Sequence, residues 1–534
     1  MAKFLFIFSL LLLSANAAFA EVESQYFDCF LHSSNFTNEA IYAPNTTAYK
    51  TIFRSSIQNL RFLSNDDTTK PSFLIQPTRA SDVQAAVSCG RRHGLGLRVR
   101  SGGHDYEGLS YVSAGGPFVI VDLANLRSVE VDSASGTAWV GAGATVGEVY
   151  YNVGVNNRTA AFPAGICTTI GVGGHFSGGG IGSLMRKYGL SADNVVDALM
   201  VNADGELLNR TSMGEELFWA LRGGGANNFG VVLSYKIRLV DVPPQVTTFS
   251  ITRTLNEDAT KLVEMWQTIA PQLVDDLWIR VMASAADVEA TGNRTIRAIF
   301  QGMFLGQRQE LLPVMEKSFP ELGLKDNDLK EMSWVQSTIS FAGYDIEDPS
   351  ILLSRKPEYN SSFKGKSDFV REPIPEMGWE EIWKFMMEGK DEPLTMILEP
   401  WGGRVGEIAE TEIAFPHRNG NLYNIQYFMR WFEKEEAVTE RHLDWMRRLH
   451  ELMTPYVSSN PRAAYLNYKD IDLGSSSEEG NAGCWESRDW GWNYYLNNYE
   501  RLAKVKAKVD PENYFWNEQS IAPFSACKPL SYKE

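Results

Sequence analysis

The chain has 534 residues, of which 44% are hydrophobic, and this length predicts a folded protein with more than one domain. Its 50 basic and 66 acidic residues give a formal charge of −16, and no dense run of lysine or arginine interrupts the acidic balance. This charge excludes nucleic-acid binding, because contacts to phosphates require a basic surface.

The N-terminus, residues 1–20, is predicted to be a secretory signal peptide. Lys3 precedes an apolar run over residues 4–13, and small side chains stand at Ala18 and Ala20, with cleavage expected after Ala20. No later apolar run approaches the roughly 20 residues that a membrane-spanning helix needs, so we expect no membrane span. We expect N-glycans at several of the six Asn-X-Ser/Thr sites, which begin at Asn35, Asn45, Asn157, Asn209, Asn293 and Asn360.

From about residue 67, short β-rich runs alternate with turn residues. The predicted strands lie at residues 118–122, 137–140 and 230–239, and a predicted helix starts at Thr145. Asp204-Gly205 separates two apolar alternations over residues 195–209, which is typical of a β-hairpin. Pro243-Pro244 then predicts a domain boundary.

Two glycine-rich loops in this part carry residues that suit a cofactor. The first reads Arg98-Val-Arg-Ser-Gly-Gly-His104, and the second runs from Cys167 through the glycines of residues 171–180. Glycine backbones let successive N–H groups converge on an anion, and His104 and Cys167 add two nucleophiles at the loop edges. We therefore predict that the loops close around a large, flat, phosphate-bearing ligand and bind it covalently. No glycine cluster has the Gly-x-Gly-x-x-Gly spacing of a nicotinamide site.

Beyond the two prolines, β-rich runs alternate with amphipathic helices. The predicted strands lie at residues 246–254, 277–285 and 423–431. Residues 435–457 form the clearest predicted helix, because Leu443 and Met446 belong to a series of apolar residues at helical spacing. We expect an antiparallel sheet with helices packed on one face. The acidic residues Asp470 and Asp472 are expected to be solvent-facing charge without a role.

These motifs closely resemble the berberine bridge enzyme-like family, plant FAD-linked oxidoreductases within the vanillyl-alcohol oxidase-type superfamily. The likeness extends through Arg186-Lys-Tyr-Gly-Leu190, Leu221-Arg-Gly-Gly-Gly225 and residues 513–520. It implies an α+β fold in which a two-subdomain FAD-binding domain of the PCMH type carries an inserted substrate domain of antiparallel sheet plus helices. The expected parts are a signal peptide at 1–20, an N-terminal segment at 21–66, the FAD-binding domain at 67–241, the substrate-binding domain at 242–470 and a C-terminal return at 471–534.

The resemblance also implies how the five cysteines are used. Cys167 is expected to bind the flavin, and Cys29 is expected to pair with Cys89, which staples the N-terminal segment to the first domain. Cys484 and Cys527 have no family counterpart. They either bond to each other or remain thiols, and their spacing does not decide between these.

By resemblance, FAD is attached bicovalently, with His104 bonded to its 8α-methyl group and Cys167 to its ring carbon 6. His175 is expected to donate a hydrogen bond to the pyrimidine edge, where negative charge accumulates on reduction. The family uses no metal, so none is expected. The other residues expected to contact the cofactor are Arg100, Ser101, Gly102, Gly103, Ile170, Gly173, Gly174, Tyr465 and Asn517.

Tyr468 is the predicted base, because residues 464–470 resemble the family's C-terminal active-site strand. The pKa of tyrosine is normally about 10, so this role requires neighbours that stabilise the phenolate. Without such neighbours, Tyr465 and Tyr468 only line a pocket. Gln426 and Tyr106 are expected to position substrate and flavin, and His175 completes the predicted catalytic set.

Several positions depart from the better-known family members. Gln426 stands where the name-giving enzyme has a catalytic glutamate, which argues against alkaloid ring closure. Ile181 and Asn424 replace the tyrosine and lysine that are typical of monolignol-oxidising members. Ile170 occupies the position of the family's oxygen gate, where bulk greater than valine predicts a dehydrogenase that reacts slowly with oxygen. The alternative is that Ile170 only packs.

We therefore predict a secreted FAD-dependent oxidoreductase that takes hydride from an alcohol, a hemiacetal or an activated C–H group. Its substrate is a small molecule, a carbohydrate or a plant specialised metabolite, with carbohydrate slightly favoured. Oxygen or a quinone-like acceptor reoxidises the flavin. The alternatives are oxidation of a phenolic alcohol or alkaloid, a flavin-containing cyclase or cycloaddition catalyst, and a binding or defence protein without turnover. The expected location is the apoplast or cell wall, with the vacuole as an alternative.

Overall fold

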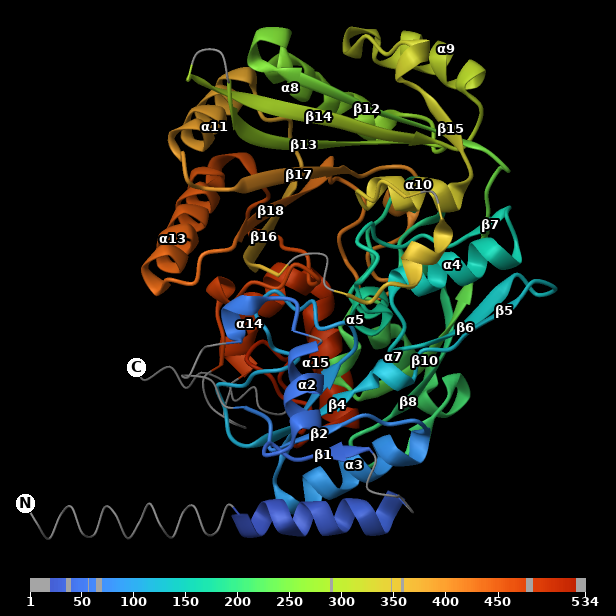
Figure 1. Ribbon diagram of the computed structural model, residues 1–534, viewed down its shortest axis with the longest axis vertical. Coiled ribbons are helices and arrows are strands. Elements are labelled where there is room, and N and C mark those ends of the chain that lie inside the picture. Colours follow the sequence, from blue (N-terminus) through green and yellow to red (C-terminus); the bar gives the residue numbers. More distant parts are fainter. Residues whose placement is uncertain are drawn as a thin grey trace, which may run out of the picture.

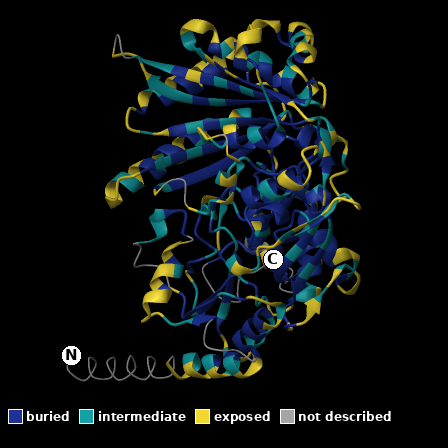
Figure 2. Cartoon of the chain, turned by 45° about the vertical axis from the view of Figure 1, so that its right-hand side comes forward, coloured by how far each residue is buried: buried dark blue, intermediate teal, exposed yellow. Residues whose placement is uncertain are grey.

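The structure, a computed structural model, describes residues 20–34, 40–55, 57–63, 70–288, 292–346, 348–356, 360–476 and 484–524. Two halves enclose one central cavity. The lower half in Figure 1 contains strands β1 to β11, and the upper half contains one large sheet, β12 to β18, with its helices. Figure 2 shows exposed residues along the outer helices and buried residues through the strands and the middle of the molecule. The predicted signal peptide lies outside the described residues except for Ala20, which is helical together with residues 21–34.

A four-stranded mixed sheet lies at the base of the lower half. Its strands, in spatial order, are β1 (Ile41–Tyr42), β2 (Phe73–Ile75), β4 (Phe118–Asp122) and β3 (Gly96–Arg100). β2 and β3 both run parallel to β4, and α3 (Ala80–His93) makes the crossover connection that parallel strands require. Every residue of β4 is buried, as expected for a strand covered on both faces. The first glycine loop follows directly at the end of β3.

A five-stranded antiparallel sheet completes the lower half. In spatial order it contains β5 (Val129–Asp132), β6 (Thr137–Gly141), β10 (Val231–Arg238), β8 (Val195–Val201) and β9 (Leu207–Leu208). The predicted hairpin around Asp204-Gly205 is confirmed, because Met200 pairs with Leu208 and Gly205 has a φ of 78°. The predicted strands in this part are confirmed as β4, β6 and β10.

The predicted helix after Thr145 is α4 (Val146–Asn156), and it begins with a capping box. The Thr145 hydroxyl accepts the N–H of Glu148 at 3.2 Å, and the Glu148 carboxylate accepts the N–H of Thr145 at 2.8 Å. The remaining elements of the lower half are α2 (Thr47–Ser55), β7 (Ala160–Ala161), α5 (Val172–Ser177), α6 (Met185–Tyr188), α7 (Arg210–Leu221), β11 (Val240–Asp241), α14 (Cys484–Tyr495) and α15 (Tyr499–Val509).

The upper half is built on a sheet of seven antiparallel strands. In spatial order they are β15 (Lys330–Met332), β12 (Val246–Thr254), β14 (Arg294–Phe304), β13 (Leu277–Asp287), β17 (Leu394–Pro400), β18 (Tyr423–Trp431) and β16 (Ser362–Val370). The predicted antiparallel sheet is therefore confirmed. Because side chains alternate along each strand, one face of this large sheet meets helices and the other faces the lower half.

In the described part of the chain, four helices lie on the outer face of the large sheet, as predicted. Trp266, Met315, Trp383 and Met446 join one apolar core with strand residues such as Ile425. They belong to α8 (Ala259–Ile269), α9 (Arg308–Ser318), α11 (Glu376–Glu388) and α13 (Glu436–Leu452). Two further helices are α10 (Trp334–Phe341) and α12 (Arg404–Glu407).

The predicted extent of the helix at residues 435–457 is wrong at its C-terminal end. α13 stops at Leu452, and Thr454–Tyr456 forms a short 3₁₀ turn. Pro455 explains this end, because proline has no N–H for a helical hydrogen bond and disfavours helical geometry in the residue before it.

The C-terminal part of the chain returns to the lower half. Leu502 and Ala503 of α15 share a core with Trp219 of α7 and Tyr494 of α14. α10 also packs against the lower half. It lies so close to α4 that a Cβ atom on Gly154 of α4 would be 1.9 Å from a methyl group of Val335. The domain boundaries at residues 66, 241 and 470 stay predictions.

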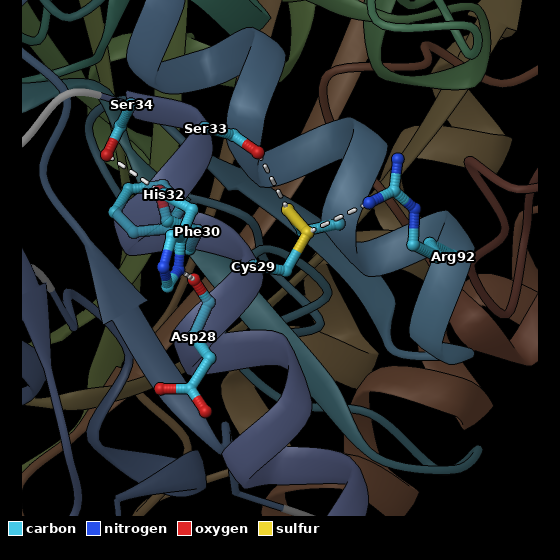
Figure 3. The surroundings of a disulfide bond; sticks show 8 residues. Asp28, Cys29, Phe30, His32, Ser33, Ser34 and Arg92 are labelled. Atoms are coloured by element: carbon cyan, nitrogen blue, oxygen red, sulfur yellow. Dashed lines mark hydrogen bonds between the residues drawn. A yellow bond between two sulfur atoms is a disulfide. The ribbon is translucent and has the colours of Figure 1, made fainter.

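The implied disulfide between Cys29 and Cys89 is confirmed (Figure 3). It joins the helix over residues 20–34 to α3 across 60 residues of sequence. The Arg92 guanidinium lies 3.7 Å from the sulfur of Cys29. Pairing of Cys484 with Cys527 lies outside what the structure describes, since neither side chain is among the described ones.

Five of the glycosylation sites lie on exposed residues, while Asn35 is outside the described ranges. The exposed asparagines are Asn45, Asn157, Asn209, Asn293 and Asn360. Within the described ranges, no helix is both long and apolar enough to cross a membrane.

Candidate active site

A cavity of about 620 Å³ lies between the glycine loops of the lower half and the inner face of the large sheet. Both glycine loops contribute to its lower wall. Side chains from β13, β17 and β18 form its upper wall, and residues 465–469 and 516–517 close it. Segments far apart in the sequence therefore meet at one site.

The two glycine loops pack against each other without room for side chains. A Cβ atom on Gly102 would lie 2.3 Å from the Gly171 nitrogen, and one on Gly171 would lie 2.1 Å from the Gly102 nitrogen. Ser101 links the loops further, since its hydroxyl donates to the Ala142 carbonyl at 2.6 Å and accepts the Gly173 N–H at 3.3 Å. These contacts explain the glycines at positions 102 and 171 as a requirement of packing.

The N-terminus of α4 positions the turn after Cys167. The N–H of Val146 donates to the carbonyl of Ile170 at 2.9 Å, and the N–H of Gly147 donates to that of Thr168 at 2.8 Å. The N–H groups at the start of a helix have no acceptor within the helix, and here two of them bind carbonyl groups of the turn. Cys167 and Ile170 consequently both face the cavity.

Thr169 lies between the two predicted attachment residues. Its hydroxyl oxygen is 2.9 Å from Nε2 of His104 and 3.5 Å from the sulfur of Cys167. Burial lowers the pKa of His104 to about 4, although an interaction with the Thr169 backbone works in the opposite direction. The imidazole is therefore neutral at neutral pH. Because Nε2 is hydrogen-bonded to the Thr169 hydroxyl, Nδ1 is the nitrogen that is left for another partner.

His175 is a buried neutral imidazole in the cavity wall. Its Nε2 accepts the Gly165 N–H at 2.8 Å, so the proton of the neutral ring resides on Nδ1. Burial, together with His104, lowers the pKa of His175 to about 4. The ring is therefore available as a hydrogen-bond donor through Nδ1, the property that its predicted role requires.

Aromatic rings form the wall between the loops and the large sheet. Tyr106 and Tyr468 lie parallel, with ring centroids 5.8 Å apart and planes inclined by 6°. Phe363 packs edge-on against Tyr106 at 5.4 Å. Gln426 donates through Nε2 to the Tyr106 hydroxyl at 2.5 Å. Gly365 of β16 is required here, because a Cβ atom would lie 2.2 Å from the ring of Tyr106.

The electrostatics of Tyr468 run against its predicted role as base. Burial raises the pKa of Tyr468 well above 10, and Tyr106, Tyr465 and Glu399 raise it further, whereas only Arg280 lowers it. The condition that the sequence interpretation required, a neighbourhood that stabilises the phenolate, is therefore not met. The phenol keeps its proton.

Tyr465 anchors the segment over residues 465–469 to the second glycine loop. Its hydroxyl accepts the Gly180 N–H at 2.8 Å, and Asn467 donates to the same oxygen at 2.8 Å. Residues 465–468 form a turn closed by the bond from the Tyr468 N–H to the Tyr465 carbonyl at 2.9 Å, so the implied active-site strand is wrong. A turn, unlike a strand, lets Tyr465 and Tyr468 both face the cavity.

An ion cluster lies behind this turn, and it corrects the expectation that Asp470 faces solvent, whereas Asp472 lies at an exposed position as expected. Asp470 is 2% exposed. Its carboxylate accepts from Lys364 and from Lys366, each at 2.7 Å, and Lys366 also pairs with Asp472 at 2.8 Å. Glu107 of the lower half completes the ion cluster through Lys364.

The structure brings most of the predicted cofactor residues to the cavity. Gly103, Gly173, Gly174 and Asn517 line it together with the residues already described. Arg100 is the exception among the predicted residues, because its guanidinium is fully buried and pairs with Asp122 at 2.6 Å. Its position supports the fold of β3 and β4, and the predicted cofactor contact through this side chain is wrong.

Glu399 and Arg280 line the cavity, although the sequence analysis did not identify them. Arg280 donates to Glu399 at 3.3 Å and, through Nε and Nη2, to the side-chain oxygen of Gln301 at 2.9 and 2.7 Å. A signal was present in the sequence, since each is a charged residue directly preceded and followed by apolar residues in its strand. The sequence does not reveal that the two side chains meet, because this depends on which strands of the large sheet are neighbours and on their register.

The residues around the cavity fit a flat, anionic cofactor. A Cβ atom on Gly174 would meet no atom within 4 Å, so the loop backbone is open toward the cavity. A neutral imidazole and a thiol stand beside this backbone, and both are chemically able to form bonds to carbon.

Two family models match the chain. Residues 71–211 match the FAD binding domain family, and residues 464–522 match the berberine and berberine like family. The matched segments contain the glycine loops and the turn with Tyr465 and Tyr468.

Known proteins match over nearly the whole chain. A tetrahydroberberine oxidase from Argemone mexicana is 49% identical over 524 residues, covering 96% of this chain and 94% of the relative. The monolignol oxidoreductase AtBBE-like 13 from Arabidopsis thaliana is 46% identical over 531 residues, covering 97% of both chains.

A solved structure shares the fold at full length. The grass pollen allergen Phl p 4, which has glucose dehydrogenase activity, superposes with a TM-score of 0.88 at 42% identity, covering 94% of this chain and all of its own. An isoleucine-to-valine variant of Phl p 4 is described as a glucose oxidase. With these similarities and a cavity between a matched FAD-binding domain and an antiparallel-sheet domain, the chain belongs to the berberine bridge enzyme-like family of FAD-dependent oxidoreductases.

Proposed function

We propose that this protein oxidises a CH–OH group of a small molecule and that His104 and Cys167 both bind FAD covalently. One observation supports the proposed covalent binding. In the cavity wall, the Thr169 hydroxyl oxygen lies 2.9 Å from Nε2 of His104 and 3.5 Å from the sulfur of Cys167. This arrangement directs Nδ1 of His104 and the Cys167 thiol to the same ligand.

When bound, FAD supplies the two-electron acceptor that takes a hydride from the substrate carbon. The protein residues then have distinct tasks. Nδ1–H of His175 donates a hydrogen bond where negative charge accumulates. Tyr106 and Tyr468 provide flat walls that restrict how a ring-shaped substrate lies, and Gln426 orients Tyr106 through its hydrogen bond.

We propose a carbohydrate as the substrate. Charged side chains in the cavity favour a neutral or acidic molecule, because four basic residues, Arg98, Arg280, Arg430 and Lys469, outnumber the acidic Asp105 and Glu399 among the residues that line it. Hydroxyl groups of a sugar find amide, guanidinium and carboxylate partners on the upper wall. The glucose dehydrogenase activity of Phl p 4 supports this choice.

A phenolic alcohol is the second candidate, favoured by the aromatic wall. Tyr106, Tyr468, Phe363 and Phe428 offer stacking surfaces to a planar ring. The monolignol oxidoreductase relative supports this candidate. A protonated alkaloid fits less well despite the tetrahydroberberine oxidase relative, because the charge balance of the cavity opposes a cation.

We further propose that the enzyme is a dehydrogenase that is secreted, glycosylated and located in the apoplast or cell wall. Ile170 lines the cavity at the position that the family resemblance assigns to the oxygen gate, where its bulk limits access of oxygen. The isoleucine-to-valine variant of Phl p 4, described as an oxidase, supports this role. Five exposed glycosylation sites support export.

An anaerobic substrate screen tests the function. The purified protein is mixed with D-glucose, cellobiose, oligogalacturonides or coniferyl alcohol while the visible flavin band is recorded, and air is then admitted. We expect bleaching by a sugar and slow recovery in air. Bleaching only by coniferyl alcohol would favour the second candidate, and rapid recovery would contradict the dehydrogenase. Loss of all flavin on acid precipitation would contradict the covalent bonds.

A further inference from the structure

We propose that Glu399 is the group that accepts the hydroxyl proton of the substrate and that Arg280 fixes its orientation. This inference rests on the proposed function, the oxidation of a CH–OH group. It follows from the position of Glu399 on the inner face of the large sheet, one strand away from Gln426.

The register of β17 and β18 places Glu399 beside Gln426. Glu399 pairs with Asn424 across the two strands, and Gln426 lies two residues further along β18 on the same face. Diagonal neighbours of this kind have their Cα atoms roughly 7–8 Å apart. A carboxylate at residue 399 therefore reaches the same part of the cavity as a side chain at residue 426, where the amide of Gln426 cannot accept a proton.

Hydrogen bonds hold the Glu399 carboxylate in one orientation. One oxygen accepts from Nη1 of Arg280 at 3.3 Å, and the other accepts from Nε1 of Trp278 at 3.2 Å. Arg280 is itself held by two bonds to Gln301. Each carboxylate oxygen has two lone pairs, so one acceptor position on each remains beyond these bonds. The carboxylate lines the cavity and is 5% exposed.

Other proton acceptors of the cavity are less suitable. Tyr468 keeps its proton, since burial raises the pKa of its phenol well above 10. His175 already uses its Nε2 lone pair to accept from Gly165. Asp105 is engaged in its own loop, where one oxygen accepts the N–H groups of Glu107 and Leu109 at 2.9 and 3.1 Å. Burial lowers the pKa of Lys469, and the charges of Asp105 and Glu518 oppose this shift by favouring the ammonium form, which has no lone pair for a proton.

The reaction balances with Glu399 as the base. The substrate C–H bond breaks and its electron pair leaves with the hydrogen to FAD, which is reduced by two electrons. The substrate O–H bond breaks, its proton forms a bond to a Glu399 oxygen, and the former O–H electron pair becomes the C=O π bond. The alcohol is thereby oxidised to a carbonyl compound and Glu399 becomes a neutral carboxylic acid.

The pKa of Glu399 suits this task. Burial raises it above the ordinary glutamate value of about 4.3, and Arg280 and Trp278 offset part of the rise. Arg280 and Tyr468 are the ionisable groups whose charges interact with Glu399, from β13 and from the C-terminal turn. A base works only when deprotonated, so substrate oxidation is retained above the pKa of Glu399 and lost as the pH falls through it.

Rapid-mixing kinetics on the holoenzyme test the proposal. Glu399→Gln removes the base and keeps the shape, and we expect the rate constant of anaerobic flavin bleaching by cellobiose or coniferyl alcohol to fall by about 10²- to 10⁴-fold. The acidic limb of the pH profile should disappear as well. Tyr468→Phe should retain that limb. The double variant Arg280→Gln/Glu399→Gln leaves no unpaired charge and should show the same loss if Glu399→Gln alone folds poorly.

Glu392→Gln is the matched control, because Glu392 is a similarly buried carboxylate paired with Arg441 and His442 outside the cavity. Its rate constant and pH profile should match those of the wild type. A Glu399→Gln enzyme that bleaches within about threefold of the wild-type rate, or that raises only KM, would overturn the proposal. So would loss of the acidic limb in Tyr468→Phe.

Infrared titration gives a readout that is independent of turnover. We expect the C=O stretch of a protonated carboxylic acid to appear, as the pH is lowered, above the range of surface carboxylates. This band should vanish in Glu399→Gln and persist in Glu392→Gln, which separates it from Asp105, whose pKa is also raised by burial. If no probe bleaches the wild-type flavin, the proposed function fails, and only this titration then tests whether Glu399 accepts a proton. Absence of the Glu399-dependent band would then overturn the proposal.

Discussion

Thr169 lies between the two residues that we propose to bind FAD covalently. Its hydroxyl contacts Nε2 of His104 and lies near the Cys167 thiol, so it orients one nucleophile and approaches the other. The low pKa of His104, near 4, means that the hydrogen bond orients a ring that is already neutral. Orientation, rather than deprotonation, is therefore what Thr169 contributes at this position.

Thr169→Val removes this hydrogen bond and keeps the side-chain volume. A hydrogen bond of about 1 kcal/mol corresponds to an effect of about fivefold, so attachment of FAD at His104 should slow by about that factor. Mass spectrometry of peptides from protein incubated with FAD for increasing times measures the bonded fraction at each residue. Thr169→Ser is the matched control and should restore the rate. Equal attachment rates in all three proteins would contradict the role of Thr169.

At the scale of elements, the ion cluster ties β16 of the upper half to the turn that presents Tyr468. Lys366→Met should lower the free energy of unfolding by about 3–5 kcal/mol, because it leaves Asp470 buried with one partner fewer. Thermal unfolding followed by circular dichroism measures this change. Lys356→Met, at an exposed position, should have little effect. A shift in Tm no larger than that of the control would show that the ion cluster does not stabilise the fold.

The same ion cluster predicts a stability that depends on acid. Burial works to raise the pKa of Asp470 and Asp472, but Lys364 and Lys366 outweigh it and hold both below their usual range. This stabilisation is complete above the unfolded pKa of about 3.9 and is lost as the pH falls through the lower folded values. The wild type should therefore lose stability below about pH 4, whereas Lys366→Met should lose less over the same window.

How far the elements could be predicted depends on which interactions define them. The strands at residues 118–122 and 423–431 follow from local pattern, and the structure contains them with the same bounds. The end of α13 at Leu452 also had a local cause, Pro455, that the helical spacing concealed. The turn at residues 465–468 depends on the Tyr465 hydroxyl meeting Gly180, a contact across 285 residues that no local pattern contains.

The candidate site divides in the same way. His104 and Cys167 could be identified from the glycines around them, because backbone demands of a loop are local. Glu399 and Arg280 could not, since their meeting depends on strand order in the large sheet. The burial of Asp470 likewise depends on lysines about a hundred residues away. Contacts between residues that are far apart in the sequence are therefore the part of the site that could not be predicted.

At the scale of the whole molecule, the Cys29–Cys89 disulfide connects the N-terminal helix to the body of the lower half. Closing a segment of this length restricts the unfolded chain and stabilises the fold by about 4 kcal/mol on the chain-entropy model. Cys29→Ser/Cys89→Ser should lower Tm without changing the visible flavin spectrum, since the cavity lies elsewhere. Calorimetry without reductant measures the shift. An unchanged Tm would mean that the disulfide contributes nothing to global stability.

Residues from opposite ends of the chain contribute to the cavity walls, and this arrangement determines when during synthesis FAD is able to bind. The glycine loops leave the ribosome early, yet Tyr465, Asn467 and Asn517, which close the cavity, are among the last residues to be made. A nascent chain therefore exposes His104 and Cys167 well before it is able to enclose a cofactor. Stable capture of FAD must wait until translation has passed residue 517, so flavin loading is a late, post-synthetic event in the life of this protein.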